Sequence, residues 1–189
     1  MIIYTDGSCL GNGKAVNTGG FGVIVLDKDE NLLYNYKKRS ENTTNNREEL
    51  KAILYSFLNY GVNINNNPLI RFNNINIPIV YSDSNYCVQT FNEWMFSWAR
   101  NGWVKSDKKT PENLDLIQAY YDWYQKGYRI DLRKVKGHAG HKWNEYADLL
   151  ATDKIDTLDV YLENGFKFED LPEVEKVRFE GYIARKGVK

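Results

Sequence analysis

The segment "IIYTDGSCLGNG", residues 2–13, decides how the N-terminal part of the chain folds. The β-branched and aromatic residues at 2–5 favour a β-strand, and this strand runs directly into Asp6. Small residues follow the carboxylate: Gly7, Ser8 and Cys9. A lone aspartate after a strand usually begins a turn, because its side chain can bond the backbone two residues further on. The rest of the chain decides between this ordinary role and a chemical one.

The composition of the 189-residue chain indicates one domain, with room for an appendage. Lys+Arg and Asp+Glu both number 25, so the net charge indicates no polyanionic partner and any basic surface must be local. The two cysteines are too few for a disulfide framework and fit a reducing compartment. We find no signal peptide and no apolar stretch of membrane-spanning length, and therefore expect a cytoplasmic protein with no membrane association.

Hydrophobic periodicity predicts a mixed sheet with helices. Residues 19–27 and 32–39 read as strands that form an antiparallel meander with the strand at 2–5. Apolar residues take helical spacing over 45–61, and Gly61 is a natural stop. Further strands are expected at 79–83 and 129–137, and further helices from Ser84, at 111–127 and at 144–152. The order β-β-β-α-β-α-α-β-α is that of an α/β or α+β fold with a mixed β-sheet.

Two segments differ from this pattern. Residues 62–78 are rich in asparagine and contain two prolines, which predicts an irregular loop. From Asp153 to Glu175 acidic residues outnumber basic ones eight to two, and the stretch 169–186 could form a terminal helix. The sequence therefore predicts a domain at 1–152 and a C-terminal extension at 153–189.

Carboxylates occupy four positions that such a fold could bring together: Asp6, Glu49, Asp83 and Asp148. Asp6 and Asp83 each follow a strand, and if those strands are neighbours the two side chains share one edge of the sheet. Oxygen ligands of this kind suit Mg²⁺, and two ions about 3.5–4 Å apart can hold both reacting oxygens of a phosphoryl displacement. Each residue also has an ordinary explanation, such as a turn or a favourable helix dipole, so spacing alone leaves the site open.

Four motifs appear in order: "TDGSCLGN" at 5–12, "TTNNREEL" at 43–50, "YSDSNYC" at 81–87 and "VKGHAGHKWNEYADLLA" at 135–151. Together they resemble type 1 ribonuclease H, the endonuclease family that cuts the RNA strand of RNA–DNA hybrids. The resemblance covers about residues 1–152. It implies a ribonuclease H-like fold, with a five-stranded mixed β-sheet flanked by helices.

The resemblance implies a catalytic assignment for the acidic residues. The family's quartet falls on Asp6, Glu49, Asp83 and Asp148, as ligands of two Mg²⁺ ions for which Mn²⁺ can substitute. Within "NREEL" the family pattern selects Glu49, which immediately precedes the leucine, and not Glu48. His138 matches a mobile histidine that helps to activate water or release product, whereas His141 fits a loop residue. The products would carry 5′-phosphate and 3′-hydroxyl ends.

The resemblance also implies a surface for the hybrid, which is the expected partner of a monomeric enzyme. The matching positions near the site are Gly7, Ser8, Cys9, Asn12, Thr44, Asn45, Asn46 and, with a shorter amide than is common, Asn85. The segment at about 94–110 resembles the basic protrusion, called the handle, of cellular members. Its net charge from Arg100 to Lys109 is +3. We expect Trp94 and Trp98 to pack partly and to bind, and Arg100 and Lys105 to meet the DNA strand.

Two other functions are alternatives to this one. A module that grips hybrids without cutting them would fit the loss of a carboxylate, but all four are present. Another nuclease of the same fold superfamily, such as a transposase or a junction resolvase, usually lacks the combination of "GHAGH", "TTNN" and the handle. The longer stretch at 62–78 and the extension at 153–189 depart from compact family members without removing a catalytic position.

Overall fold

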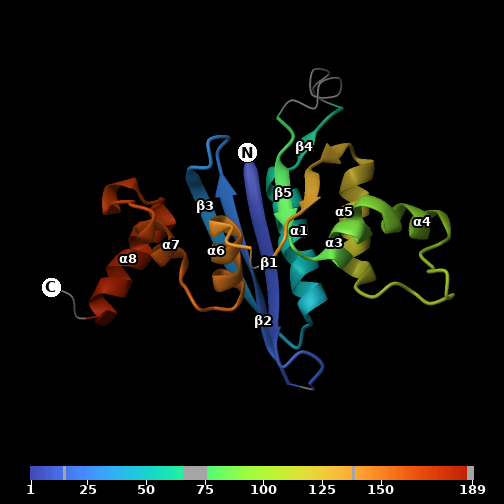
Figure 1. The fold of residues 1–189 in the computed structure, drawn as a ribbon, viewed down its shortest axis with the longest axis horizontal. Coiled ribbons are helices and arrows are strands. Elements are labelled where there is room, and N and C mark those ends of the chain that lie inside the picture. The colour runs from blue at the N-terminus through green and yellow to red at the C-terminus, as the bar shows by residue number, and fades with distance from the viewer. Residues whose placement is uncertain (15, 66–75, 138, 187–189) are drawn as a thin grey trace.

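The computed structural model describes residues 1–14, 16–65, 76–137 and 139–186, so most of the loop predicted at 62–78 lies outside the described residues. A five-stranded mixed sheet forms the centre (Figure 1), which confirms the predicted fold class. Its strands, in the order β3-β2-β1-β5-β7, are β1 (Ile2–Leu10), β2 (Thr18–Leu26), β3 (Leu32–Glu41), β5 (Ile79–Ser82) and β7 (Asp131–Lys134). A separate pair joins β4 (Val62–Asn63) to β6 (Tyr128–Arg129).

Helices pack on both faces of the sheet. They are α1 (Asn45–Tyr60), α3 (Asn85–Gln89), a π-helical turn (Thr90–Trp94), α4 (Met95–Arg100), α5 (Leu114–Gln125), α6 (Lys142–Ala151), α7 (Thr157–Glu163), a 3₁₀ turn (Phe168–Asp170) and α8 (Glu173–Lys186). Among the described helices, none combines the length and the apolar composition needed to cross a bilayer.

Two hydrophobic cores lie on opposite faces of the sheet. Ile3 and Val23 belong to the core under α1, whereas Tyr4 and Ile24 belong to the core under α6. Successive residues of a strand point to opposite faces, so β1 and β2 contribute to both layers. Figure 1 shows α1 and α6 on the two sides of the central strands. The carboxylates predicted on the two helices therefore approach the sheet from different faces.

The strand β1 is longer than the sequence predicts, and its two edges differ. Its parallel pairing with β5 stops at Thr5 and Ser82, which confirms that the first strand neighbours the strand before Asp83. Its antiparallel pairing with β2 continues through Gly7 to Leu10, so the prediction that the strand ends before Asp6 is wrong. Small residues are compatible with a strand when a partner supplies the ladder hydrogen bonds. From Asp6 onward, β1 has an open edge on the β5 side.

Two other elements differ from the predictions, and a third agrees with its prediction. The strand expected at 129–137 is divided into β6 and β7, which pair with different partners. The helix expected at 111–127 begins only at Leu114, because Asn113 has a left-handed backbone conformation with φ 56°. The helix expected from Ser84 is confirmed, and the Ser84 hydroxyl accepts a hydrogen bond of 3.3 Å from the amide of Cys87.

The segment after α6 packs onto the sheet. Leu158 and Tyr161 of α7 are buried in the second core, and the Tyr161 hydroxyl accepts a hydrogen bond of 3.3 Å from the Asn35 amide of β3. The expected terminal helix corresponds to α8, which begins after Pro172. Arg178 of α8 donates two hydrogen bonds to Asp156, at 2.7 and 2.9 Å. The extension thus completes the layer that begins with α6.

Candidate active site

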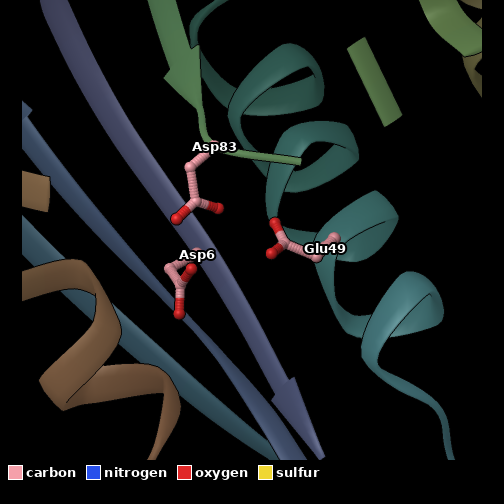
Figure 2. A group of neighbouring side chains, drawn as sticks. All are labelled: Asp6, Glu49 and Asp83. Carbon is pink, nitrogen blue, oxygen red and sulfur yellow. The ribbon is translucent and has the colours of Figure 1, made fainter. Parts of the chain in front are cut away.

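Three of the four predicted carboxylates form one group. Asp6 of β1, Glu49 of α1 and Asp83, which follows β5, offer oxygen atoms that all lie within 4.8 Å of one another. Figure 2 shows Asp6 and Asp83 beside Glu49, whose side chain extends from α1 toward them. Asp6 and Glu49 are buried, and Asp83 is half-buried.

Because the edge of β1 is open beside Asp6, side chains from the two faces of the sheet can approach one another there. Asp6 points to the same face as Tyr4, toward α6, whereas Gly7 faces α1. Since β5 ends beside Thr5, no strand separates Glu49 from Asp6. Gly137, just after β7, lies so close to Asp83 that an added Cβ would stand 2.4 Å from its Oδ2 atom. The strand ends and α1 together therefore enclose the carboxylates.

The electrostatics of this group favour a bound cation. Burial, followed by the charges of Asp83 and Asp148, raises the pKa of Asp6 to about 8. Burial and the charges of Asp6 and Asp83 raise the pKa of Glu49 well above its ordinary value. Glu49 Oε2 is also buried without a hydrogen-bond partner among the described residues. An all-carboxylate donor set with an unpaired buried oxygen fits a hard divalent ion such as Mg²⁺.

The two adjacent glutamates of α1 have different environments. Glu48 accepts hydrogen bonds from Thr43, Ser40 and Lys51, at 2.6, 3.2 and 2.6 Å. Glu49 instead faces two other carboxylates. The position selected at the sequence level is thus the one with unused ligand capacity, and Glu48 is engaged elsewhere.

The fourth carboxylate and the histidine stand apart from this group. Asp148 of α6 is half-buried, and its charge contributes to the raised pKa of Asp6, but it is not within the group of three. His138 lies outside the described residues, so its predicted role stays a prediction. His141 is exposed at the N-terminal boundary of α6 and makes no side-chain capping bond there.

Three of the predicted hybrid-contacting residues near the site, Cys9, Asn12 and Asn45, are linked by hydrogen bonds. The side-chain oxygen of Asn45 accepts a hydrogen bond of 2.6 Å from the backbone amide of Cys9, and the backbone amide of Asn45 donates to the Asn12 side-chain oxygen at 3.4 Å. Thr44 caps α1 by accepting from the Arg47 amide. The exposed members are Asn12, Thr44, Asn45, Asn46 and Asn85; Gly7 and Ser8 are half-buried and Cys9 is buried. The space beside Gly7 is occupied by the α1 backbone, not left free for a substrate.

The predicted handle carries an aromatic hollow. The rings of Trp94 and Trp98 lie 5.9 Å apart between centroids, and both are half-buried. With Lys105 and neighbouring residues they line a cavity of about 340 Å³. Trp98 also packs against the core under α1, and Arg100 is exposed at the end of α4. The two roles expected of the tryptophans are partial packing and binding of the hybrid, and this half-buried arrangement is compatible with both.

One residue beside the site was missed at the sequence level. Lys134, at the end of β7, donates a hydrogen bond of 2.5 Å from its ammonium to the backbone carbonyl of Asp83. It lies in an alternating strand with other basic residues, and nothing in that pattern distinguishes it from a solvated lysine. Only the parallel pairing of β5 with β7 places it there.

Comparisons with known proteins agree with this geometry. The family model described as RNase H matches residues 1–156. Ribonuclease H of Wolbachia pipientis wMel is 39% identical over 160 residues, which cover 82% of this chain and 94% of the relative. Ribonuclease H of Thermoanaerobacter sp. (strain X514) is 38% identical over 158 residues, covering 81% of this chain and 88% of the relative.

Solved structures show the same fold. LC9-RNase H1, described as a type 1 RNase H with the type 2 active-site motif, superposes with a TM-score of 0.56 at 29% identity, covering 80% of this chain and 70% of that one. The PFV RNase H domain gives a TM-score of 0.63 at 21% identity, covering 80% and 92%. Family model, relatives and fold coincide over the segment that carries the carboxylates, so the chain belongs to the RNase H family and is a ribonuclease H enzyme.

Proposed function

We propose that the protein hydrolyses the RNA strand of RNA–DNA hybrids with two divalent metal ions, leaving 5′-phosphate and 3′-hydroxyl ends. The observation that carries this proposal is the group of Asp6, Glu49 and Asp83, with all three within 4.8 Å and an unpaired buried oxygen on Glu49. The family membership supports ribonuclease action, and the structure of LC11-RNase H1, whose fold this chain shares at a TM-score of 0.51, was solved in complex with an RNA/DNA hybrid.

The carboxylates would hold the metal, Mg²⁺ by preference with Mn²⁺ as a substitute. Asp6 would be shared between two ions, Glu49 and Asp83 would hold the one on the leaving-group side, and Asp148 would complete the other. Ions in such sites supply a more acidic bound water and offset the charge that develops on the phosphate. The protein's own part is to orient the carboxylates and shield them from bulk water, and a bound cation would favour their ionised forms.

Residues around the carboxylates would recognise the hybrid. Asn45 uses its amide oxygen on Cys9, which leaves its amide hydrogens for the substrate. Groups of this kind can distinguish RNA from DNA through the 2′-hydroxyl, which both donates and accepts. Lys105 and Arg100 would meet phosphates of the DNA strand beside the tryptophans. His138 would assist with water or with product release. The monomeric state, the cytoplasmic location and the boundary at 152 stay predictions from the sequence.

A three-substrate assay tests the proposal. Purified protein is incubated with Mg²⁺ and an RNA–DNA hybrid, double-stranded DNA or double-stranded RNA. We expect cleavage of the hybrid alone, and end-labelled products that carry the stated ends. Asp6→Asn should fold and should not cut. Cleavage of double-stranded DNA would favour another nuclease of the superfamily, and binding of hybrid without cleavage by the wild type would favour a binding module.

A further inference from the structure

The glutamate beside the candidate metal ligand is fully buried and fully bonded. Glu48 has no exposed surface, and its Oε1 atom accepts from the Thr43 hydroxyl and from the Lys51 ammonium, both at 2.6 Å. Its Oε2 atom accepts from Ser40 at 3.2 Å. A buried carboxylate is costly unless its hydrogen bonds and its charge are both matched. Here they are matched, and the matching fixes the position of the Thr43 side chain.

Thr43 is held on every side. Its amide donates to Asn17 at 2.8 Å, and its carbonyl accepts from the Cys9 thiol at 3.5 Å. Its methyl group lies against β2, where a Cβ added to Gly19 would stand 2.5 Å away. The Glu48 carboxylate supplies the one partner that reaches Thr43 from α1 itself. The turn before α1 is thus tied to the helix that carries Glu49.

The residues that follow Thr43 are those proposed to touch the hybrid. Thr44 and Asn45 are exposed, and Asn45 is tied to Cys9 of β1. A change in the position of Thr43 would pass directly to these two neighbours in the chain. The Glu48 carboxylate itself is buried and cannot meet a substrate.

We infer that Glu48 is a positioning residue for substrate binding, which acts through Thr43 to hold Thr44 and Asn45 in the orientation that receives the hybrid. The inference rests on the proposed function, because it assigns a role toward the same substrate. Its effect belongs to substrate binding and not to the chemical step, since the Glu48 carboxylate bonds Ser40, Thr43 and Lys51 and is not part of the group of three carboxylates.

The test combines kinetics with a double-mutant cycle. Glu48→Met fills similar space and offers no acceptor, Glu48→Gln keeps an oxygen for Thr43, and Thr43→Val removes the donor while keeping the shape. Ser56→Ala is the matched control, because it removes a buried hydroxyl bond to Ala52 on the same helix, away from the turn. Steady-state kinetics are measured on a hybrid, and hybrid binding is measured with a chelator present.

We expect Glu48→Met to raise KM and to weaken hybrid binding by about fivefold to tenfold, with kcat changed by less than about twofold. Glu48→Gln should recover most of the loss, and Ser56→Ala should change neither parameter. The double variant of Glu48→Met with Thr43→Val should be no worse than the poorer single variant, because both remove one link.

Unchanged KM and binding in Glu48→Met, even with a lower melting temperature, would overturn the inference and leave the proposed function intact. Additive effects in the cycle would overturn the route through Thr43. Absence of hybrid cleavage by the wild-type protein would instead overturn the proposed function, and the inference with it.

Discussion

Gly7 of β1 lies directly against Glu49 of α1: a Cβ built on Gly7 would stand 2.1 Å from the Glu49 amide nitrogen and 2.6 Å from its Cα. The obstacle is backbone, which no side-chain rotation can remove. This contact sets how closely the helix approaches the strand, and thereby how far the Glu49 carboxylate reaches toward Asp6. The small residue after the first carboxylate is thus required by the fold of the site.

Gly7→Ala should displace the start of α1 and lower kcat strongly, with a loss of about 1–3 kcal/mol in the free energy of unfolding from overpacking. Chemical denaturation and steady-state kinetics measure the two effects. Gly61→Ala is the matched control, because its Cβ would meet the Phe57 carbonyl at 2.5 Å at the other end of the same helix. The control should lose stability and keep kcat; an equal loss of kcat in both variants would refute a local role for Gly7.

The contribution of Asp6 to the stability of the metal-free protein, measured as the difference between wild type and Asp6→Asn, should fall as pH rises from about 4 to about 8. The pKa of Asp6 is raised in the folded protein to about 8, so the folded state binds more protons than the unfolded state in this window. For each additional proton that the folded state binds, the free energy of unfolding falls by up to about 1.4 kcal/mol for every unit by which the pH rises. Unfolding is measured in a chelator at several pH values. A difference in free energy of unfolding between wild type and Asp6→Asn that rises with pH would contradict the assignment.

Mg²⁺ should stabilise the protein more at pH 8 than at pH 6. Carboxylates must lose their protons before they bind a metal, and burial raises the pKa of both Asp6 and Glu49. Melting temperatures with and without Mg²⁺ at the two pH values measure the difference. In Glu49→Gln the stabilisation should shrink at both pH values; a metal effect that survives in this variant would place the ion elsewhere.

Substitution of Asp148 should reduce activity less than substitution of Asp83. Asp83 belongs to the group within 4.8 Å, whereas Asp148 stands outside it on α6. We therefore expect Asp83→Asn to abolish hybrid cleavage and Asp148→Asn to leave a measurable rate at raised Mg²⁺. Kinetics over a range of Mg²⁺ concentrations test this. Equal loss in both variants, with no recovery at high Mg²⁺, would mean that the two carboxylates contribute alike.

Removal of residues 153–189 should destabilise the whole protein. Leu158, Val160 and Tyr161 are buried in the second core, and Tyr161 also accepts from Asn35 of β3. Truncation of a large buried aromatic side chain costs about 3–5 kcal/mol, so Tyr161→Ala alone should lower the melting temperature clearly. Val177→Ala in α8 is the control, because Val177 is 71% exposed. A fully stable protein ending at Thr152 would show that the extension is dispensable for the fold.

The layers and the order of elements could be predicted because they follow from periodicity. The helical spacing at 45–61 predicted α1, and the strand-like segments at 2–5, 19–27 and 32–39, joined by short connections, predicted the meander. The length of β1 could not be predicted, since Gly7 and Ser8 have low strand preference and only pairing with β2 keeps them extended. The start of α5 could not be predicted either, because Pro111 favours a helix start and the sequence does not indicate the left-handed conformation of Asn113.

For the site, motif order predicted which carboxylates matter, but not how they differ. Asp6, Glu49 and Asp83 come together while Asp148 stays outside the group, a distinction that depends on how α6 sits on β2. The Lys134 ammonium reaches the backbone carbonyl of Asp83 from a position 51 residues away, and the Ser40 hydroxyl reaches Glu48 from β3. Spacing along one chain contains no record of such contacts.

The early end of β5 has a consequence for biosynthesis. Because β1 has no pairing with β5 beyond Thr5, carboxylates approach Asp6 from both faces of the sheet: Glu49 from α1 and, through its charge, Asp148 from α6. A growing chain therefore lacks one of the four carboxylates until α6, which lies late in the sequence, has left the ribosome and packed onto the sheet. Until then the chain would lack the charge that Asp148 adds beside Asp6, so full catalytic activity would require both layers to be in place.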